Sequence, residues 1–217
     1  MNPALTMTRR IAQLAVGLFA YGIAIALIVR AAIGVAPWDV LSQGIVKQTG
    51  LSFGVVTVVL SVVVLLFWIP IKQKPGIGTL LNALFVGPSA EVGLALLPEP
   101  DSLVMQIVFF AGGLALLAIA TGLYIGARFG PGPRDGLMTG IHRRFGFKIW
   151  IVRTAIEVTV LTIGWILGGN VGIGTLAFAL LIGPMVNVTL PLLRVPETPV
   201  AEALEAPPSR TSGSVPA

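Results

Sequence analysis

The sequence predicts an all-α membrane protein with six transmembrane helices, built as two inverted three-helix repeats. Each repeat is expected to carry a short interfacial or re-entrant helix after its first span. Two observations support this fold class. Hydrophobic residues make up 55% of the chain and charged residues 11%, with a mean hydropathy of +0.94, whereas a soluble domain carries about 25% charged residues. Shifted by 96 positions, the sequence also matches itself without a gap from Gly17 to Leu97.

The internal match joins motifs of the same kind. Pro37-Trp38-Asp39 falls on Pro133-Arg134-Asp135, and the Gly-Ile-Gly-Thr-Leu run at 76–80 falls on the run at 172–176. The dipeptide Gly87-Pro88 falls on Gly183-Pro184. Because an internal repeat fixes the architecture, the two halves are expected to share one helix pattern.

Six apolar stretches are long enough to span a bilayer, which takes about 20 residues. They cover about 10–32, 51–71, 76–98, 103–127, 148–168 and 172–193. The first could pass for a signal peptide, but its recurrence inside the chain indicates a retained helix. The stretches at 35–49 and 131–146 are too short and polar to span, which makes them the interfacial or re-entrant helices.

Lysine and arginine set the expected orientation. With the N-terminus in the cytoplasm, the outside segments carry only Arg30 and Lys47, so the positive-inside rule favours both termini inside. Three spans per repeat is an odd number, so the second copy would enter the membrane inverted. If the short helices crossed the membrane, the repeat would be parallel instead.

The chain divides accordingly into four segments. Residues 1–8 form a cytoplasmic N-terminus, 9–98 the first three-helix repeat and 99–194 the second. Residues 195–217 are rich in Pro, Ser and Ala and offer little to bury, which predicts a disordered cytoplasmic tail.

Two aspartates, Asp39 and Asp135, occupy equivalent Pro-x-Asp motifs. In the inverted topology they would face opposite sides and form a symmetric pair of gates, with Arg134 and the region of Arg30 and Arg128 as partners. The alternative is structural: Pro starts a short helix and Asp stabilises its N-terminus.

The dipeptides Gly87-Pro88 and Gly183-Pro184 fall near the centres of the third and sixth spans. Matching Gly/Pro interruptions in two halves point to a midplane binding site, although a packing kink is equally consistent with them. Polar residues accompany both dipeptides: Asn82 and Glu91 in the third span and Asn187 in the sixth. The Gly-x-Gly-Thr motifs that open these two spans favour close helix packing.

Arg153 and Glu157 are the sharpest single-residue signal. They lie four residues apart in the fifth span, where charges are costly and mark either a self-satisfied ion pair or a role in solute, proton or anion handling. The equivalent residues Thr57 and Ser61 are uncharged, so only one half carries these charges.

Several function classes are not expected. The chain has no cysteine and one histidine (His142), and it shows no metal-ligand spacing, so we expect neither a metal nor another cofactor. Basic residues are scattered between apolar runs rather than clustered on a soluble face, so nucleic acid is not an expected partner. No nucleophile motif indicates an enzyme.

Four stretches together resemble the bacterial YczE/YyaS/YitT family of integral membrane proteins, over about residues 9–193. They are Ala36 to Leu41, Leu123 to Ala127, Gly130 to Gly140, and Gly172 to Thr175. The resemblance implies a bacterial plasma-membrane protein and transfers no substrate and no catalytic residue.

The leading functional expectation is a permease for a small solute, or the membrane-embedded subunit of a transporter, with its site between the inverted repeats. The alternative is a membrane scaffold or accessory factor for another enzyme or assembly, without transport. The expected partners are the lipid bilayer and an unknown small solute, with a second copy or a transporter partner as further candidates.

Overall fold

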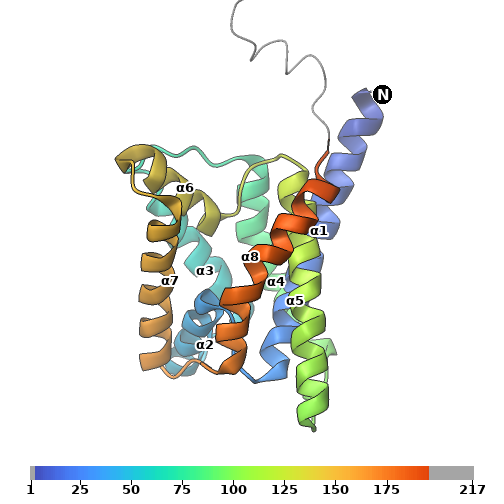
Figure 1. Cartoon of the computed structure of the whole chain (residues 1–217), viewed down its shortest axis with the longest axis vertical. Helices are drawn as coiled ribbons and strands as arrows, with labels where there is room; N and C mark the ends of the chain where they lie inside the picture. The colour runs from blue at the N-terminus through green and yellow to red at the C-terminus, as the bar shows by residue number, and fades with distance from the viewer. Residues whose placement is uncertain (1–2, 196–217) are drawn as a thin grey trace, which may run out of the picture.

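A computed structural model describes residues 3–195 of the chain (Figure 1). The described residues form eight helices and no strand. The helices are α1 (Pro3–Ala31), α2 (Pro37–Thr49), α3 (Phe53–Leu66), α4 (Ile77–Leu96), α5 (Leu103–Gly126), α6 (Pro133–Phe145), α7 (Ile149–Ile166) and α8 (Ile173–Leu193).

Five helices are long and apolar enough to cross a membrane: α1, α4, α5, α7 and α8. The pair α2 and α3, bent by 117° at its break, is a sixth candidate span. The all-helical class is therefore confirmed, with five to six spans. The α3 helix stops at Leu66, short of the expected 71, and the N–H groups of residues 67–69 bond three residues back in a tighter turn that leads to Pro70.

The two ends of the described chain both continue from the helical bundle. The N-terminal segment is helical from Pro3 and continues into the first span without a break. At the other end, Val195 is buried, and its N–H donates to the carbonyl of Gly126 at 3.1 Å. The first residue of the expected tail is thus packed on the bundle, and residues 196–217 lie outside the described residues.

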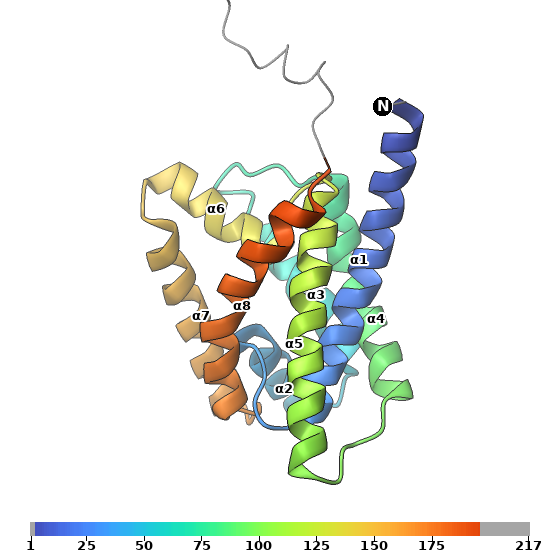
Figure 2. The ribbon, with the colours of Figure 1, turned by 45° about the vertical axis from the view of Figure 1, so that its right-hand side comes forward.

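The helix pattern repeats with the period of the sequence. The starts of α2 and α6, of α3 and α7, and of α4 and α8 are each 96 residues apart. The equivalent helices α1 and α5 lie side by side and form the most extensively packed pair (Figures 1 and 2). Their contact can be close because Gly113 has no side chain. A Cβ at this position would lie 3.0 Å from the carbonyl oxygen of Ala24.

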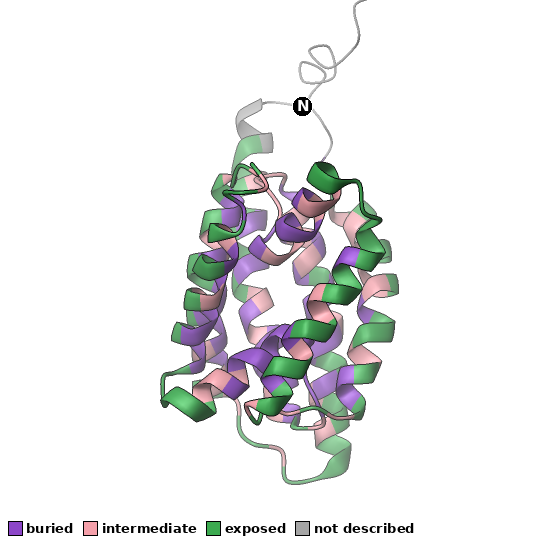
Figure 3. Ribbon diagram, turned by 90° about the vertical axis from the view of Figure 1, so that its left-hand side faces the viewer, coloured by how far each residue is buried: buried purple, intermediate pink, exposed green. Residues whose placement is uncertain are grey.

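The short helices α2 and α6 begin inside the bundle and end at its surface. Residues 37–42 of α2 are buried and residues 47–50 are exposed. In α6, Pro133 is buried, whereas residues 143–146 are exposed. The two helices lie at opposite ends of the bundle, and α1 begins at the same end at which α8 finishes (Figure 1). Figure 3 shows the buried residues on the inward helix faces.

The two halves are joined by crossed hydrogen bonds. The N–H of Gly78 at the start of α4 donates to the carbonyl of Phe129, and the N–H of Gly174 at the start of α8 donates to the carbonyl of Ile33, both at 2.8 Å. The hydroxyl of Thr79 donates to the carbonyl of Pro131 at 2.7 Å. The Gly-x-Gly-Thr motifs therefore serve close packing, as expected.

The contact between α3 and α4 has no equivalent among the described residues of the second half. The α3 helix packs against α4, where a Cβ on Gly87 would lie 2.4 Å from the carbonyl oxygen of Gly54. Their counterparts α7 and α8 are not packed in this way. Trp150 stands where Gly54 stands in the first half, and, apart from the adjoining turns of α8 itself, no atom of the described residues lies within 4 Å of a Cβ built on Gly183.

The expected interruptions at Gly87-Pro88 and Gly183-Pro184 are absent. The α4 and α8 helices run continuously through both prolines, which are exposed on the outer surface. A proline removes one backbone donor, and within a bundle such a loss is tolerated without breaking the helix.

Candidate functional site

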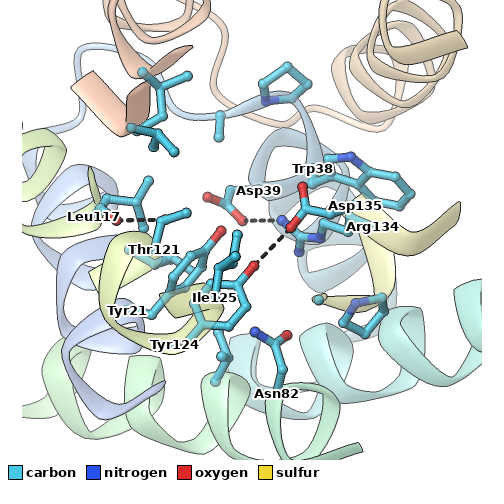
Figure 4. A pocket seen from close by; sticks show the side chains of 18 of the residues that line it. Tyr21, Trp38, Asp39, Asn82, Leu117, Thr121, Tyr124, Ile125, Arg134 and Asp135 are labelled. Carbon is cyan, nitrogen blue, oxygen red and sulfur yellow. Dashed lines mark hydrogen bonds and ion pairs between the residues drawn. The ribbon is translucent and has the colours of Figure 1, made fainter. Parts of the chain in front are cut away.

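A cavity of about 340 Å³ lies within the bundle, and all eight helices contribute to its wall. Pockets for small molecules span roughly 300–1,000 Å³, so the cavity suits a small solute. Polar and charged side chains line one part of it and apolar side chains the rest (Figure 4).

The wall is built from equivalent positions of the two halves. Ten residue pairs that are 96 positions apart both line the cavity. They are Tyr21/Leu117, Ile25/Thr121, Ala36/Gly132, Pro37/Pro133, Trp38/Arg134, Asp39/Asp135, Thr57/Arg153, Ser61/Glu157, Asn82/Phe178 and Val86/Ile182. The cavity therefore lies where the two halves face each other.

The centre of the site is an ion pair between the two short helices. Asp39 lies in the first turn of α2 and Arg134 in the first turn of α6, with 3.6 Å between a guanidinium nitrogen and the carboxylate Oδ1. The Arg134 guanidinium also lies over the Trp38 ring, 5.0 Å from its centroid. The Asp39 side chain is almost completely buried, so its carboxylate is shielded from solvent.

Asp135 is held by a tyrosine. The hydroxyl of Tyr124 donates to its Oδ2 at 2.8 Å, and Tyr21 packs edge-on against Tyr124 with 5.7 Å between ring centroids (Figure 4). Asp39 and Asp135 consequently line one cavity, and the expectation of one aspartate at each of two mouths is wrong. The reason is that both short helices start inside the bundle.

The pair of Arg153 and Glu157 lies at the edge of this cavity. The Nε of Arg153 donates to the Glu157 carboxylate at 2.9 Å within α7. The Arg153 side chain is 47% exposed and that of Glu157 23%. The two charges therefore satisfy each other and also line the cavity, and a role in solute, proton or anion handling stays a prediction.

The remaining candidates divide into two groups. Asn82, Asn187 and Gly183 line the cavity, whereas Gly87, Pro88, Pro184 and Glu91 do not. The Glu91 carboxylate accepts from the N–H of Gly54 at 2.6 Å and so fixes the start of α3 against α4. This contact accounts for the Glu91 carboxylate without the cavity.

Of the three arginines considered as partners for the aspartates, Arg134 pairs with Asp39. Arg30 pairs with Glu99 near the end of α4, away from the cavity, and Arg128 does not line the cavity either.

Sequence reasoning did not identify Tyr21, Tyr124 or Trp38 as site residues. A signal was present for the tyrosines, since they are the only two in the chain and both lie in apolar spans. A buried phenolic hydroxyl needs a hydrogen-bond partner, and Asp135 supplies it for Tyr124.

The cavity presents charged groups of both signs. It holds three carboxylates and two guanidinium groups, and no three His, Cys, Asp or Glu side chains of residues 3–195 are grouped so as to hold a metal ion. Charged groups of both signs in a confined, partly apolar space can orient a small polar solute.

Among known proteins, the chain matches the model of a family of unknown function, DUF6198, over residues 8–191. An uncharacterized protein of Haemophilus influenzae is 40% identical over 179 residues, which is 82% of each chain.

Two relatives come from Bacillus subtilis. The uncharacterized membrane protein YczE is 31% identical over 161 residues, covering 74% of this chain and 75% of its own. The uncharacterized protein YyaS is 28% identical over 182 residues, covering 82% and 90%. No solved structure matches.

Proposed function

This chain belongs to the family of unknown function DUF6198, which confirms the resemblance to YczE and YyaS, and from that premise we propose that it is a permease for a small solute. The observation that carries the proposal is the cavity, to whose wall both halves contribute equivalent residues. At its centre the Asp39–Arg134 pair joins the two halves. A change in this contact would alter how the halves sit against each other.

The proposal includes the inverted arrangement of the repeats. It is supported by the short helices, which begin inside and end at opposite ends of the bundle. The crossed bonds of Gly78 with Phe129 and of Gly174 with Ile33 also support it, since each is the counterpart of the other. Secondary transporters place their sites between such repeats.

The membrane in question is the bacterial plasma membrane, with both termini in the cytoplasm. The excess of Lys and Arg on the segments at that end supports this orientation. The surrounding bilayer is the first partner, and it covers the exposed apolar side chains of α7 and α8.

Single-cysteine accessibility tests this function without knowledge of the substrate, because the chain has no native cysteine. The probe position is Thr121, a cavity residue of α5. The controls are Thr49 at the exposed end of α2 and Arg144 at the exposed end of α6. Each residue is replaced by Cys and labelled with a membrane-impermeant maleimide in right-side-out and in inside-out vesicles.

A permease must open its cavity to both sides in turn. We therefore expect the Thr121→Cys variant to be labelled in both vesicle types, and each control variant in one type only, with opposite preference. Labelling of Thr121→Cys from one side only would refute a permease and favour the scaffold or accessory role. Labelling from both sides only after a partner ATPase is added would identify a transporter subunit.

A further inference from the structure

Three buried polar atoms around the cavity lack a hydrogen-bond partner among residues 3–195. They are Oδ1 of Asp39, Nε1 of Trp38 and Oγ1 of Thr57, and all three residues line the cavity. Each residue is at most 8% exposed. Arg134 approaches Asp39 Oδ1 only to 3.6 Å, which is beyond hydrogen-bond range. Buried polar groups are normally satisfied, so these atoms point to a ligand.

The chemistry of these atoms restricts that ligand. A carboxylate oxygen only accepts, and an indole Nε1–H only donates. The complement of Asp39 is therefore an N–H donor, and the complement of Trp38 is an oxygen acceptor. The Thr57 hydroxyl serves either role. A molecule that carries both groups would satisfy the site.

The charge balance adds a third restriction. The cavity holds the carboxylates of Asp39, Asp135 and Glu157 against the guanidinium groups of Arg134 and Arg153. Arg153 is bonded to Glu157, which leaves Arg134 with two carboxylates close to the start of α6. A ligand with one positive charge would restore neutrality in a region of low dielectric.

We infer that the cavity binds a small solute with a protonated primary amine and an oxygen acceptor, with Asp39 as the counter-ion of the amine. The inference rests on the proposed function and names its substrate class. The rings of Tyr21, Trp38 and Tyr124 lie around the same region (Figure 4) and suit a cation, since aromatic faces attract positive charge.

The competing ligand is an anion. Two helix N-termini and Arg134 would favour a carboxylate or phosphate, but Asp39 and Asp135 occupy those first turns with negative charge. Binding of amines and of acids of matched size therefore distinguishes a cationic ligand from an anionic one.

The test measures the melting temperature of the purified full-length protein in detergent. The probes are ethanolamine and tyramine, paired with the acids glycolate and 4-hydroxyphenylacetate, each at millimolar concentration. A ligand that binds only the folded state raises the melting temperature. We expect a rise of several degrees with the amines and none with the acids. A rise with the acids alone, or with neither set, would overturn the inference.

Two substitutions test whether Asp39 is the counter-ion of the amine. Asp39→Asn keeps the size of the side chain and removes its charge, so the rise with ethanolamine should disappear. Glu91→Gln is the matched control, because Glu91 is a part-buried carboxylate outside the cavity, and here the rise should persist. An equal rise in Asp39→Asn and in the unsubstituted protein would contradict the assignment of Asp39.

Two further comparisons hold even if Asp39→Asn fails to fold. Choline carries the charge of ethanolamine but no N–H donor, so its effect should be smaller. In the Trp38→Phe variant, the advantage of ethanolamine over ethylamine should be lost, since the donor to the oxygen is gone. A choline effect equal to that of ethanolamine, or an ethanolamine advantage that persists in Trp38→Phe, would refute the proposed hydrogen bonds.

The experiments can refute the permease and the amine ligand independently of each other. Two-sided labelling of Thr121→Cys without any amine effect would retain the permease and reject the amine. An amine effect with one-sided labelling would retain the binding site and reject transport.

Discussion

The guanidinium group of Arg134 lies over the indole ring of Trp38, 5.0 Å from its centroid, although the two residues occupy the same position in the two repeats. Equivalent residues touch only where the two halves meet. Duplication alone would have placed like side chains there. The sequence instead provides an arginine and an aromatic ring, a pair that attracts.

The first prediction concerns the Asp39–Arg134 pair. Arg134→Gln removes the partner of a buried carboxylate and should lower the free energy of unfolding by about 3 kcal/mol, since an uncompensated buried charge is costly. Thermal unfolding in detergent measures the loss.

A double-mutant cycle provides the control for this prediction. The Asp39→Asn substitution added to Arg134→Gln should recover part of the lost stability, because no buried charge is then left alone. Additive losses would show that the two side chains are not energetically coupled.

The second prediction compares equivalent glycines. A Cβ on Gly87 would lie 2.4 Å from the carbonyl oxygen of Gly54, whereas, apart from the adjoining turns of α8 itself, no atom of the described residues lies within 4 Å of a Cβ on Gly183. Gly87→Ala should therefore cost about 1–3 kcal/mol through overpacking. Gly183→Ala should be neutral or stabilising by up to about 1 kcal/mol, because alanine favours a helix. Equal melting temperatures for the two variants would contradict the asymmetry between α3–α4 and α7–α8.

The third prediction concerns the crossed contact at the start of α4. The Thr79 hydroxyl donates to the carbonyl of Pro131 and accepts from the N–H of Gly76. Thr79→Val keeps the shape and leaves both groups unsatisfied, which should cost about 1–3 kcal/mol. Thr159→Val on the exposed face of α7 is the matched control and should leave the melting temperature unchanged. A similar loss in both variants would assign the effect to helix propensity.

The fourth prediction separates stability from the cavity. Glu91→Ala removes the acceptor of the Gly54 N–H and should lower the melting temperature through an unsatisfied buried donor. The labelling pattern of Thr121→Cys should persist in this variant, since Glu91 does not line the cavity. A changed pattern would place Glu91 in the permeation mechanism.

Much of the fold follows from the sequence because its signals are local. Hydrophobic length predicts the spans, and Pro37 and Pro133 start the two short helices within two residues of the expected positions. The polar candidates Asp39, Arg134 and Asp135 were also identified in this way, since a charge in an apolar context stands out.

Other features depend on packing that a single sequence does not display. Tyr124 belongs to the site because its ring points from α5 toward Asp135. The sequence of an apolar span with one tyrosine does not show which side of the helix faces the site. Glu91 was a site candidate, yet it does not line the cavity, and its carboxylate accepts a hydrogen bond from the N–H of Gly54. The Gly-Pro pairs indicated interruptions, whereas the helices continue through them, because the cost of one missing donor depends on the neighbours.

The crossed hydrogen bonds bear on the biogenesis of the protein. The first residues of α4 bond to a carbonyl that follows α5, namely Phe129, so the ribosome synthesises the donor before its acceptor. A nascent chain that ends after α4 has no internal partner for Gly78. This contact between the two halves can therefore form only after residue 129, beyond the end of α5, has been synthesised.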